Sequence, residues 1–148
     1  MDDAEVDAFL RSNKTMILVS NGHNGHPHPM PMWFGIEDGG TIVMTTFRKS
    51  QKVNNIRNDP RVTLLVEAGL EYNELKSVMI YANAEVIDDL TETTNVMLGL
   101  AKVRGEVSDA QMEAARANME KTASKRVVLR MTPTTVVSWD HSKLGGKY

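Results

Sequence analysis

The residues best suited to do chemistry lie at positions 45–52, TTFRKSQK, where a run rich in β-branched residues passes into a short helical segment. Hydroxyl groups, cationic side chains and the free backbone N–H groups of a helix N-terminus are typical phosphate ligands. This stretch therefore predicts an anion site. The alternative is that its serine only caps the helix and that its cations are solvated. The side chains concerned are the hydroxyls of Thr45, Thr46 and Ser50 and the cations of Arg48, Lys49 and Lys52.

A second group of reactive side chains is formed by the histidines at positions 23, 26 and 28, with His141 near the C-terminus. A strand would place His26 and His28 on one face, which suits two metal ligands. Prolines alternate with them, however, and no Asp, Glu or Cys nearby completes a ligand set. We therefore expect no metal and interpret the histidines as surface or substrate-contacting residues. No Gly-x-Ser-x-Gly elbow occurs either, which excludes that type of serine hydrolase.

The apolar run at 29–34, PMPMWF, offers polarizable surface for a flat aromatic ring. The same run would also suit the core of a barrel. Strand alternation lets both interpretations hold at once, since Met30, Met32 and Phe34 share one side and Pro31 and Trp33 the other. The polar, aromatic tail that begins at Trp139 is too short for a domain and is typical of a loose chain end.

The composition of the 148 residues bounds the possible functions. With 17 Lys plus Arg, 19 Asp plus Glu and no Cys, the net charge is −2. The absence of cysteine excludes a disulfide framework, a thiolate nucleophile and a zinc ribbon, and the near-neutral charge argues against nucleic-acid binding. No apolar run is long enough to cross a membrane, and the acidic N-terminus is unlike a signal peptide. We expect one cytoplasmic domain over residues 1–148.

The elements that must position these groups are mostly strands. Strands are predicted at 15–20, from about 28, at 41–47, 61–67, 77–87 and 126–139, with a bulge or corner at 132–134 in the last. The first three are expected to form an antiparallel meander. Helices are predicted after an Asp3 cap to about 12, at 51–58 after Ser50, and as a pair, of which the first ends at Gly105 and the second opens with a capping box at 108–111.

Helical spacing also predicts which side of each helix is buried. These inner-face residues are Val6, Phe9 and Leu10; Val53 and Ile56; Leu90, Thr94, Met97, Leu98 and Ala101; and Met112, Ala115 and Met119. Mainly antiparallel strands interrupted by a few helices predict an α+β fold, in which a small closed β-barrel carries its helices outside.

The order of three segments resembles the split β-barrel family of flavin and deazaflavin oxidoreductases, the superfamily that includes pyridoxamine 5′-phosphate oxidase. The segments are 25–34, then 45–62, and finally 127–133 with Trp139. The run KVNNIRNDPR at 52–61, with the pattern K-x-x-N-I-x-x-D-P-R, is the most specific part, and the resemblance spans nearly the whole chain.

This resemblance implies a six- to seven-stranded antiparallel split β-barrel that forms a homodimer with two cofactor sites at the subunit interface. By carry-over, Ser50 and Lys52 bind the cofactor phosphate, with Thr46 and Arg48 or Lys49 nearby. Asn55 would pack beneath the cofactor, and its ring would lie against residues 30–33. Trp139 and the tail resemble a segment that helps to close the site, in some members that of the partner subunit.

The family implies several cofactors, because FMN oxidases, deazaflavin reductases and haem-handling members share the fold. Where pyridoxamine 5′-phosphate oxidase has Ser-Arg-Lys, this chain has Ser50-Gln51-Lys52, and it has no clear counterpart of the C-terminal Arg and His that bind pyridoxal phosphate. It looks more like the short actinobacterial proteins that bind coenzyme F-420, whose lactyl-phosphate and polyglutamate tail would need cations such as Arg48, Lys49, Arg57, Arg61 and Lys125.

The resemblance therefore implies an F-420-dependent oxidoreductase that reduces an unsaturated, quinone-like or tetrapyrrole small molecule. The alternatives are an FMN-binding oxidoreductase of the pyridoxamine phosphate oxidase type and a non-catalytic flavin- or haem-binding protein. The cofactor itself carries the hydride, so no catalytic acid or base is assigned. If a proton donor is needed, His28 or His141 could supply it, and Tyr72 or Tyr81 are weaker candidates.

Overall fold

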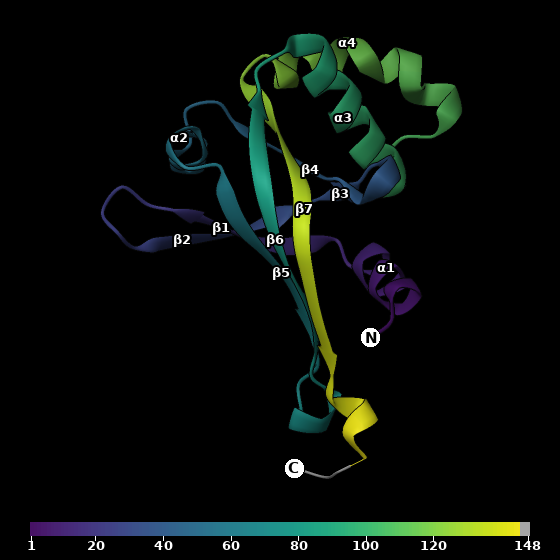
Figure 1. The fold of residues 1–148 in the computed structure, drawn as a ribbon. Coiled ribbons are helices and arrows are strands. Elements are labelled where there is room, and N and C mark those ends of the chain that lie inside the picture. Colours follow the sequence, from purple (N-terminus) through teal and green to yellow (C-terminus); the bar gives the residue numbers. More distant parts are fainter. Residues whose placement is uncertain (146–148) are drawn as a thin grey trace.

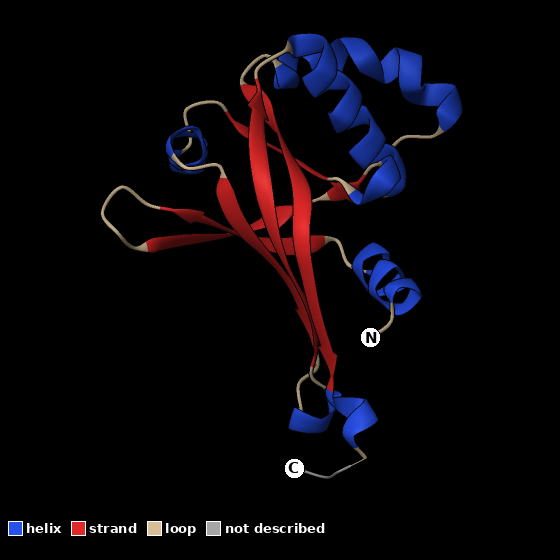
Figure 2. Ribbon diagram, viewed as in Figure 1, coloured by secondary structure: helices blue, strands red, loops and turns tan. Residues whose placement is uncertain are grey.

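The computed structural model describes residues 1–145, which form a seven-stranded antiparallel sheet that curls on itself (Figures 1 and 2). The order of strands in the sheet is β2-β1-β5-β6-β7-β4-β3. The edge strands β2 and β3 are consecutive in the chain, so the two edges meet at the single residue between them, Phe34. This is the expected split barrel of an α+β fold. The strands are β1 (Thr15–Asn21), β2 (Pro27–Trp33), β3 (Gly35–Ile36), β4 (Ile42–Phe47), β5 (Arg61–Ala68), β6 (Lys76–Ile87) and β7 (Arg126–Asp140).

The expected meander of the first three long strands is wrong. β1 pairs with β2, but β4 pairs with β7 and with the short β3. The prolines of β2 account for this difference in strand pairing. Successive backbone N–H groups of a strand point to opposite edges, and proline has no N–H. Pro27, Pro29 and Pro31 are spaced two apart, so all three remove hydrogen-bond donors from the same edge of β2. The other edge of β2 is occupied by β1, so β4 finds no donors beside β2.

The last strand has nearly the predicted range, 126–140 against 126–139, but it continues through the position where a bulge or corner was expected to turn it into a further strand. β7 is one strand of 15 residues, and its residues 128–140 pair with the whole of β6. The expected bulge is present, since the register shifts where Tyr81 pairs with Thr135 and Ala82 with Pro133. Thr134 is the extra residue, and its hydroxyl donates a hydrogen bond of 3.0 Å to the Tyr81 carbonyl. The strand does not turn a corner into a further strand, so that alternative is wrong. The bulge accommodates Pro133, which has no N–H to donate, and the strand continues beyond it.

Four α-helices surround the barrel in Figure 2. The cap of the first is Asp2 rather than the expected Asp3: the Asp2 carboxylate accepts from the Glu5 N–H at 2.9 Å, and the Glu5 carboxylate accepts from the Asp2 N–H at 2.8 Å. The capping box at 108–111 forms, but it opens a 3-10 turn before the last helix. The helices are α1 (Asp3–Ser12), α2 (Gln51–Asn58), α3 (Leu90–Val103) and α4 (Met112–Ala123); 3-10 turns lie at Asp38–Gly40, Tyr72–Glu74, Asp109–Gln111 and His141–Leu144.

The main core fills the inside of the barrel, and α2 buries Val53 and Ile56 against it as predicted. A second, smaller core joins α3 to the outer side of β4 and β7. There Gly35 allows a close approach, because a Cβ at this position would lie 2.5 Å from the Leu100 side chain. Leu90 was expected in the inner face of α3 but is 48% exposed, since it begins the helix before the helix reaches the sheet.

Candidate cofactor site

A buried polar cluster lies at the junction between β4 and α2. It consists of Thr46 at the end of β4, Ser50 just before α2 and Lys52 in the first turn of α2. The Lys52 ammonium donates a hydrogen bond of 3.1 Å to the Thr46 hydroxyl, which lies 3.4 Å from the Ser50 hydroxyl. We call Thr46, Ser50 and Lys52 the polar cluster. Lys52 is only 8% exposed and Thr46 only 4%.

The polar cluster is electrostatically incomplete. Within residues 1–145 no carboxylate lies within ion-pair distance of Lys52, and burial lowers the pKa of its ammonium. Ser50 occupies the N-cap position of α2, yet its side chain makes no capping hydrogen bond. A buried cation without a counter-ion is destabilising, and a bound phosphate would supply both the charge and the acceptor oxygens. The cluster therefore fits the phosphate end of a cofactor.

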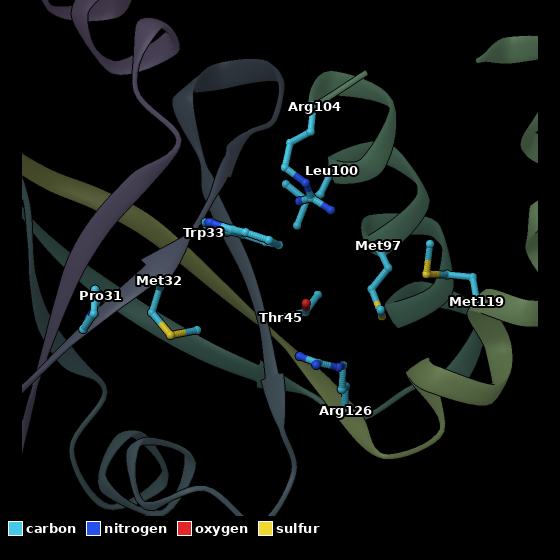
Figure 3. Close-up of a pocket in the computed structure, with 9 residues that line it drawn as sticks. All are labelled: Pro31, Met32, Trp33, Thr45, Met97, Leu100, Arg104, Met119 and Arg126. Carbon is cyan, nitrogen blue, oxygen red and sulfur yellow. The ribbon is translucent and has the colours of Figure 1, made fainter. Parts of the chain in front are cut away.

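Thr45 and Thr46 face opposite sides of β4, because successive strand residues alternate. Thr45 lines a separate hollow of about 310 Å³ between β2, β4, α3, α4 and β7. Figure 3 shows Trp33 on one side of this hollow and Met97 and Met119 on the other, with Arg104 and Arg126 at opposite ends. We call it the outer pocket; its lining is Pro31, Met32, Trp33, Thr45, Met97, Leu100, Arg104, Met119 and Arg126.

Arg48 is not part of the polar cluster. Its guanidinium binds the Asp88 carboxylate at 2.8 and 2.9 Å and the Ser124 carbonyl at 2.9 Å. The hydrogen bond to Asp88 raises the pKa of Arg48. The side chain thus ties the end of β4 to the segment after β6 and to the end of α4, which is a structural role.

The other predicted tail-binding cations fall into two groups. Arg61 pairs with Asp59 at 2.7 Å, and this contact holds the pKa of the Asp59 carboxyl well below its usual range. Arg57 lies 3.9 Å from Asp88. Lys49 and Lys125, in contrast, have no ion-pair partner in the part of the chain that the structure describes.

Lys49 and Lys125 lie together around a hollow of about 430 Å³, which Phe47 and Arg48 complete. The Arg48 N–H donates to the Lys125 carbonyl at 3.0 Å, which holds the two loops side by side. We call this hollow the lysine hollow. Its lining begins one residue after Thr46 in the chain, but strand alternation places Phe47 on the other side of β4, and the lysine hollow shares no lining residue with the polar cluster.

Asn55 lies beneath the polar cluster. Its amide donates to the Ser20 hydroxyl of β1 at 3.1 Å and accepts from Gln51 at 2.8 Å. Asn55 therefore fixes α2 to the sheet. On the neighbouring β2, Met30 and His28 point inward and are half-buried, and the His28 Nδ1 atom is buried without a hydrogen-bond partner among residues 1–145.

Trp139 lies far from both sites of its own chain. It pairs with Ser77 near the end of β7, whereas Arg126 of the outer pocket begins that strand. A strand of 15 residues spans about 50 Å at roughly 3.3 Å per residue. Figure 1 shows this end of β7 pointing away from α3 and α4. Trp139 cannot reach the outer pocket of its own chain.

The tail that follows Trp139 is held at the tip of the β5–β6 hairpin. The His141 Nδ1 lies 2.9 Å from the Tyr72 carbonyl oxygen, and the two rings are 4.7 Å apart. Lys143 pairs with Glu5 of α1 at 2.6 Å. These contacts make both His141 and Tyr72 part of the hairpin tip, remote from the outer pocket. Residues 146–148 of the predicted tail lie outside the described residues.

Sequence reasoning missed the side of the outer pocket that α3, α4 and β7 provide. Met97 and Met119 carried a helical-periodicity signal, but that signal predicts burial and not a pocket wall. Arg104 and Arg126 carried no signal beyond a charged residue next to an apolar run. Only the packing of the helical pair over the outer side of β4 brings these four side chains to Trp33 and Thr45.

Comparison with protein families matches residues 2–140 to Pyridoxamine 5′-phosphate oxidase. The chain belongs to the pyridoxamine 5′-phosphate oxidase family. The resemblance drawn from the motif at 52–61 is thus confirmed. Among residues 1–145, no helix is long and apolar enough to span a membrane, and no group of three or more His, Asp or Glu side chains could hold a metal ion.

Solved structures include several relatives of this family member. The conserved hypothetical protein Rv2991 from Mycobacterium tuberculosis is 32% identical, with a TM-score of 0.87 over 100% of this chain and 90% of that chain. An F-420 reductase is 20% identical, with a TM-score of 0.65 over 88% and 94%. The haem storage protein HutZ from Vibrio cholerae is 15% identical, with a TM-score of 0.70 over 91% and 92%. No curated protein sequence matches the chain.

Proposed function

We propose that this protein is an oxidoreductase that uses the deazaflavin coenzyme F-420 to transfer a hydride to an unsaturated, quinone-like or tetrapyrrole small molecule. The observation that carries the proposal is the buried Lys52 of the polar cluster, which has no counter-ion within residues 1–145, together with Lys49 and Lys125 of the lysine hollow, whose lining begins one residue after Thr46 in the chain. F-420 has a phosphate followed by an anionic polyglutamate tail, so it carries anions for both groups of cations. When bound, the cofactor supplies the hydride, and the protein binds it, orients it and excludes water.

The chain's own residues would share this work between the two sides of β4. Thr46, Ser50 and Lys52 would bind the phosphate, and Lys49 and Lys125 would bind carboxylates of the tail. The outer pocket, with Trp33 as its aromatic wall, would hold the substrate beside the cofactor ring. Each charge-assisted hydrogen bond to the phosphate contributes about 1.5–3 kcal/mol to binding.

FMN is the alternative cofactor, and the charge distribution favours F-420 over it. FMN ends at its phosphate, so the polar cluster would satisfy it and Lys49 and Lys125 would remain unpaired. Arg48, which could add a second cation for an FMN phosphate, is already bound to Asp88. The structural similarity to an F-420 reductase supports the same choice.

A titration of the full-length apo protein with F-420, FMN and the deazaflavin chromophore without phosphate or tail tests the proposal, at one fixed ionic strength. We expect F-420 to bind tightest. The double variant Lys49→Gln/Lys125→Gln should weaken F-420 binding about tenfold and leave FMN binding unchanged. The control Lys14→Gln/Lys121→Gln removes the same charge at two exposed positions elsewhere and should change neither. Tighter binding of FMN than of F-420 by the parent protein would overturn the assignment.

A homodimer is the second part of the proposal. One apolar row crosses the outer face of five strands in register: Pro31, Ile17, Leu65, Met79 and Val137. In Figure 2 no helix of the described chain covers the outer face of β5, β6 and the lower half of β7. A continuous apolar sheet face exposed to water marks an interaction surface.

A second copy of the chain is the occupant that the geometry favours for this face. Trp139 is 38% exposed at the far end of β7 and cannot reach the outer pocket of its own chain. An antiparallel pairing of two such faces would reverse β7 and bring the Trp139 end of one chain towards the outer pocket of the other. The tail would then close the partner's site.

A further inference from the structure

The outer pocket has apolar walls and a limited volume. Trp33 forms one wall and is 59% exposed, while Met97, Leu100 and Met119 form the wall opposite (Figure 3). Its volume of about 310 Å³ is at the lower end for small-molecule pockets. Methionine and tryptophan side chains suit the faces and edges of a conjugated ring. These walls fit one ring or two fused rings.

The two arginines of the outer pocket differ in how their charge is compensated. The Arg104 guanidinium lies 4.7 Å from the centre of the Trp33 ring and binds the Glu106 carboxylate at 2.7 and 2.9 Å. Arg104 therefore has its own counter-ion. It contributes a flat surface beside Trp33 and little net charge.

Arg126 has no counter-ion among residues 1–145. Its guanidinium lies 4.3 Å from the centre of the Phe47 ring, and its Nε atom is buried without any hydrogen-bond partner in the described chain. A buried donor without an acceptor is costly, and a guanidinium is built to bind the two oxygens of a carboxylate. Arg126 thus brings an uncompensated positive charge to this end of the outer pocket.

We propose that Arg126 binds the carboxylate of the substrate, and that the substrate is a compact conjugated acid whose ring lies between Trp33 and the methionines of α3 and α4. This inference rests on the proposed function, because it narrows the acceptors named there to small unsaturated carboxylates. A tetrapyrrole is much larger than the pocket. Thr45, on the same side of β4, would contact the ring or its unsaturated substituent.

Arg126 also lies near the lysine hollow, because both contact Phe47. The cofactor tail carries carboxylates too, so the same guanidinium could serve the tail. Arg126 lines the outer pocket and is not among the residues that line the lysine hollow, which favours the substrate. The experiment below separates the two uses by measuring cofactor and acid binding independently.

The test is calorimetric titration of the full-length protein with cinnamate and with cinnamamide, which has the same shape and no charge. We expect cinnamate to bind at least about tenfold more tightly than the amide. Arg126→Gln should abolish this preference, Arg126→Lys should keep part of it, and Arg104→Gln should keep most of it. Circular dichroism checks that each variant is folded. The comparison of acid with amide in the unmodified protein needs no variant at all.

The outcomes separate the two proposals. Equal binding of acid and amide by the unmodified protein, or an acid preference that survives Arg126→Gln, would overturn the role of Arg126. The same holds if Arg126→Gln weakens F-420 binding as strongly as Lys49→Gln/Lys125→Gln, since Arg126 would then belong to the cofactor tail. Failure of F-420 to bind, with the acid preference intact and dependent on Arg126, would overturn the cofactor assignment and leave the acid site standing.

Discussion

The two sides of β4 are built differently although they share one strand. On the inner side, Thr46 lies in a buried cluster with Lys52 that one chain completes by itself except for an anion. On the outer side, Thr45 lines an open pocket whose wall includes the 59% exposed Trp33. The difference shows how strand alternation places neighbouring residues in separate sites, a buried polar cluster on the inner side and an open pocket on the outer side.

The largest expected effect is on dimer formation, which would bury the apolar row on the outer face of the sheet. Val137→Lys would place a charge in the apolar row, and burial of an unpaired charge costs several kcal/mol. We expect light scattering to show a single chain for this variant and a dimer for the unmodified protein. Val103→Lys is the matched control, because Val103 is 81% exposed outside the row. If the unmodified protein is monomeric at micromolar concentration, the proposed homodimer is wrong.

The next effect concerns the inner side. Lys52→Ala should weaken F-420 binding by about 1.5–3 kcal/mol, because it removes the charged donor from the phosphate. Fluorescence titration of the deazaflavin measures the change. An unaltered affinity would exclude Lys52 from the cofactor site and with it the functional contrast between the two sides of β4.

Lys52 should strengthen cofactor binding but lower the stability of the apo protein. Burial lowers the native pKa of Lys52 below its unfolded value of 10.5, so the unfolded chain binds the proton more tightly. Stability therefore rises with pH between the two pKa values, and below that range the full cost of the buried charge is present. Lys52→Met should raise the free energy of unfolding by about 1 kcal/mol at pH 7. Urea denaturation between pH 7 and about pH 10 should also show a smaller pH slope for this variant.

The smallest effect is the most direct comparison of the two sides. Thr46→Val removes the hydroxyl that Lys52 contacts and should weaken F-420 binding by about 1 kcal/mol. Thr45→Val, one residue away, should leave F-420 phosphate binding within about twofold, roughly 0.4 kcal/mol. Titrations of both variants with F-420 measure the two losses of binding affinity. Equal losses of affinity in the two variants would show that one site spans both sides of the strand.

Much of the fold follows from local patterns. The range of α2, its Ser50 N-cap position and its buried Val53 and Ile56 were all predicted, because Asp59-Pro60 ends a helix of clear periodicity. The bulge in β7 was predicted from Pro133. The meander failed because strand pairing depends on which backbone edge is free, and residue types alone do not report how prolines spaced two apart affect one edge.

The candidate site was predictable only in part. Thr46, Ser50 and Lys52 come together as expected because they are close in the chain. Arg48 does not join them, since Asp88 and Ser124, both remote in sequence, bind its guanidinium. Trp139 was expected to begin a loose tail, but it lies in β7 and pairs with Ser77. Its distance from the outer pocket depends on the length of β7.

The sequence by itself determined the family, most of the strands and helices, and the gathering of hydroxyl and cationic side chains at the junction 45–52, because these depend on short-range spacing and on ordered motifs. The tertiary structure alone decided which cations are free and which are paired, and it brought Arg126, Met97 and Met119 to Trp33. The physical reason is that charge compensation and pocket walls depend on contacts between residues far apart in the chain, which only the packed fold specifies.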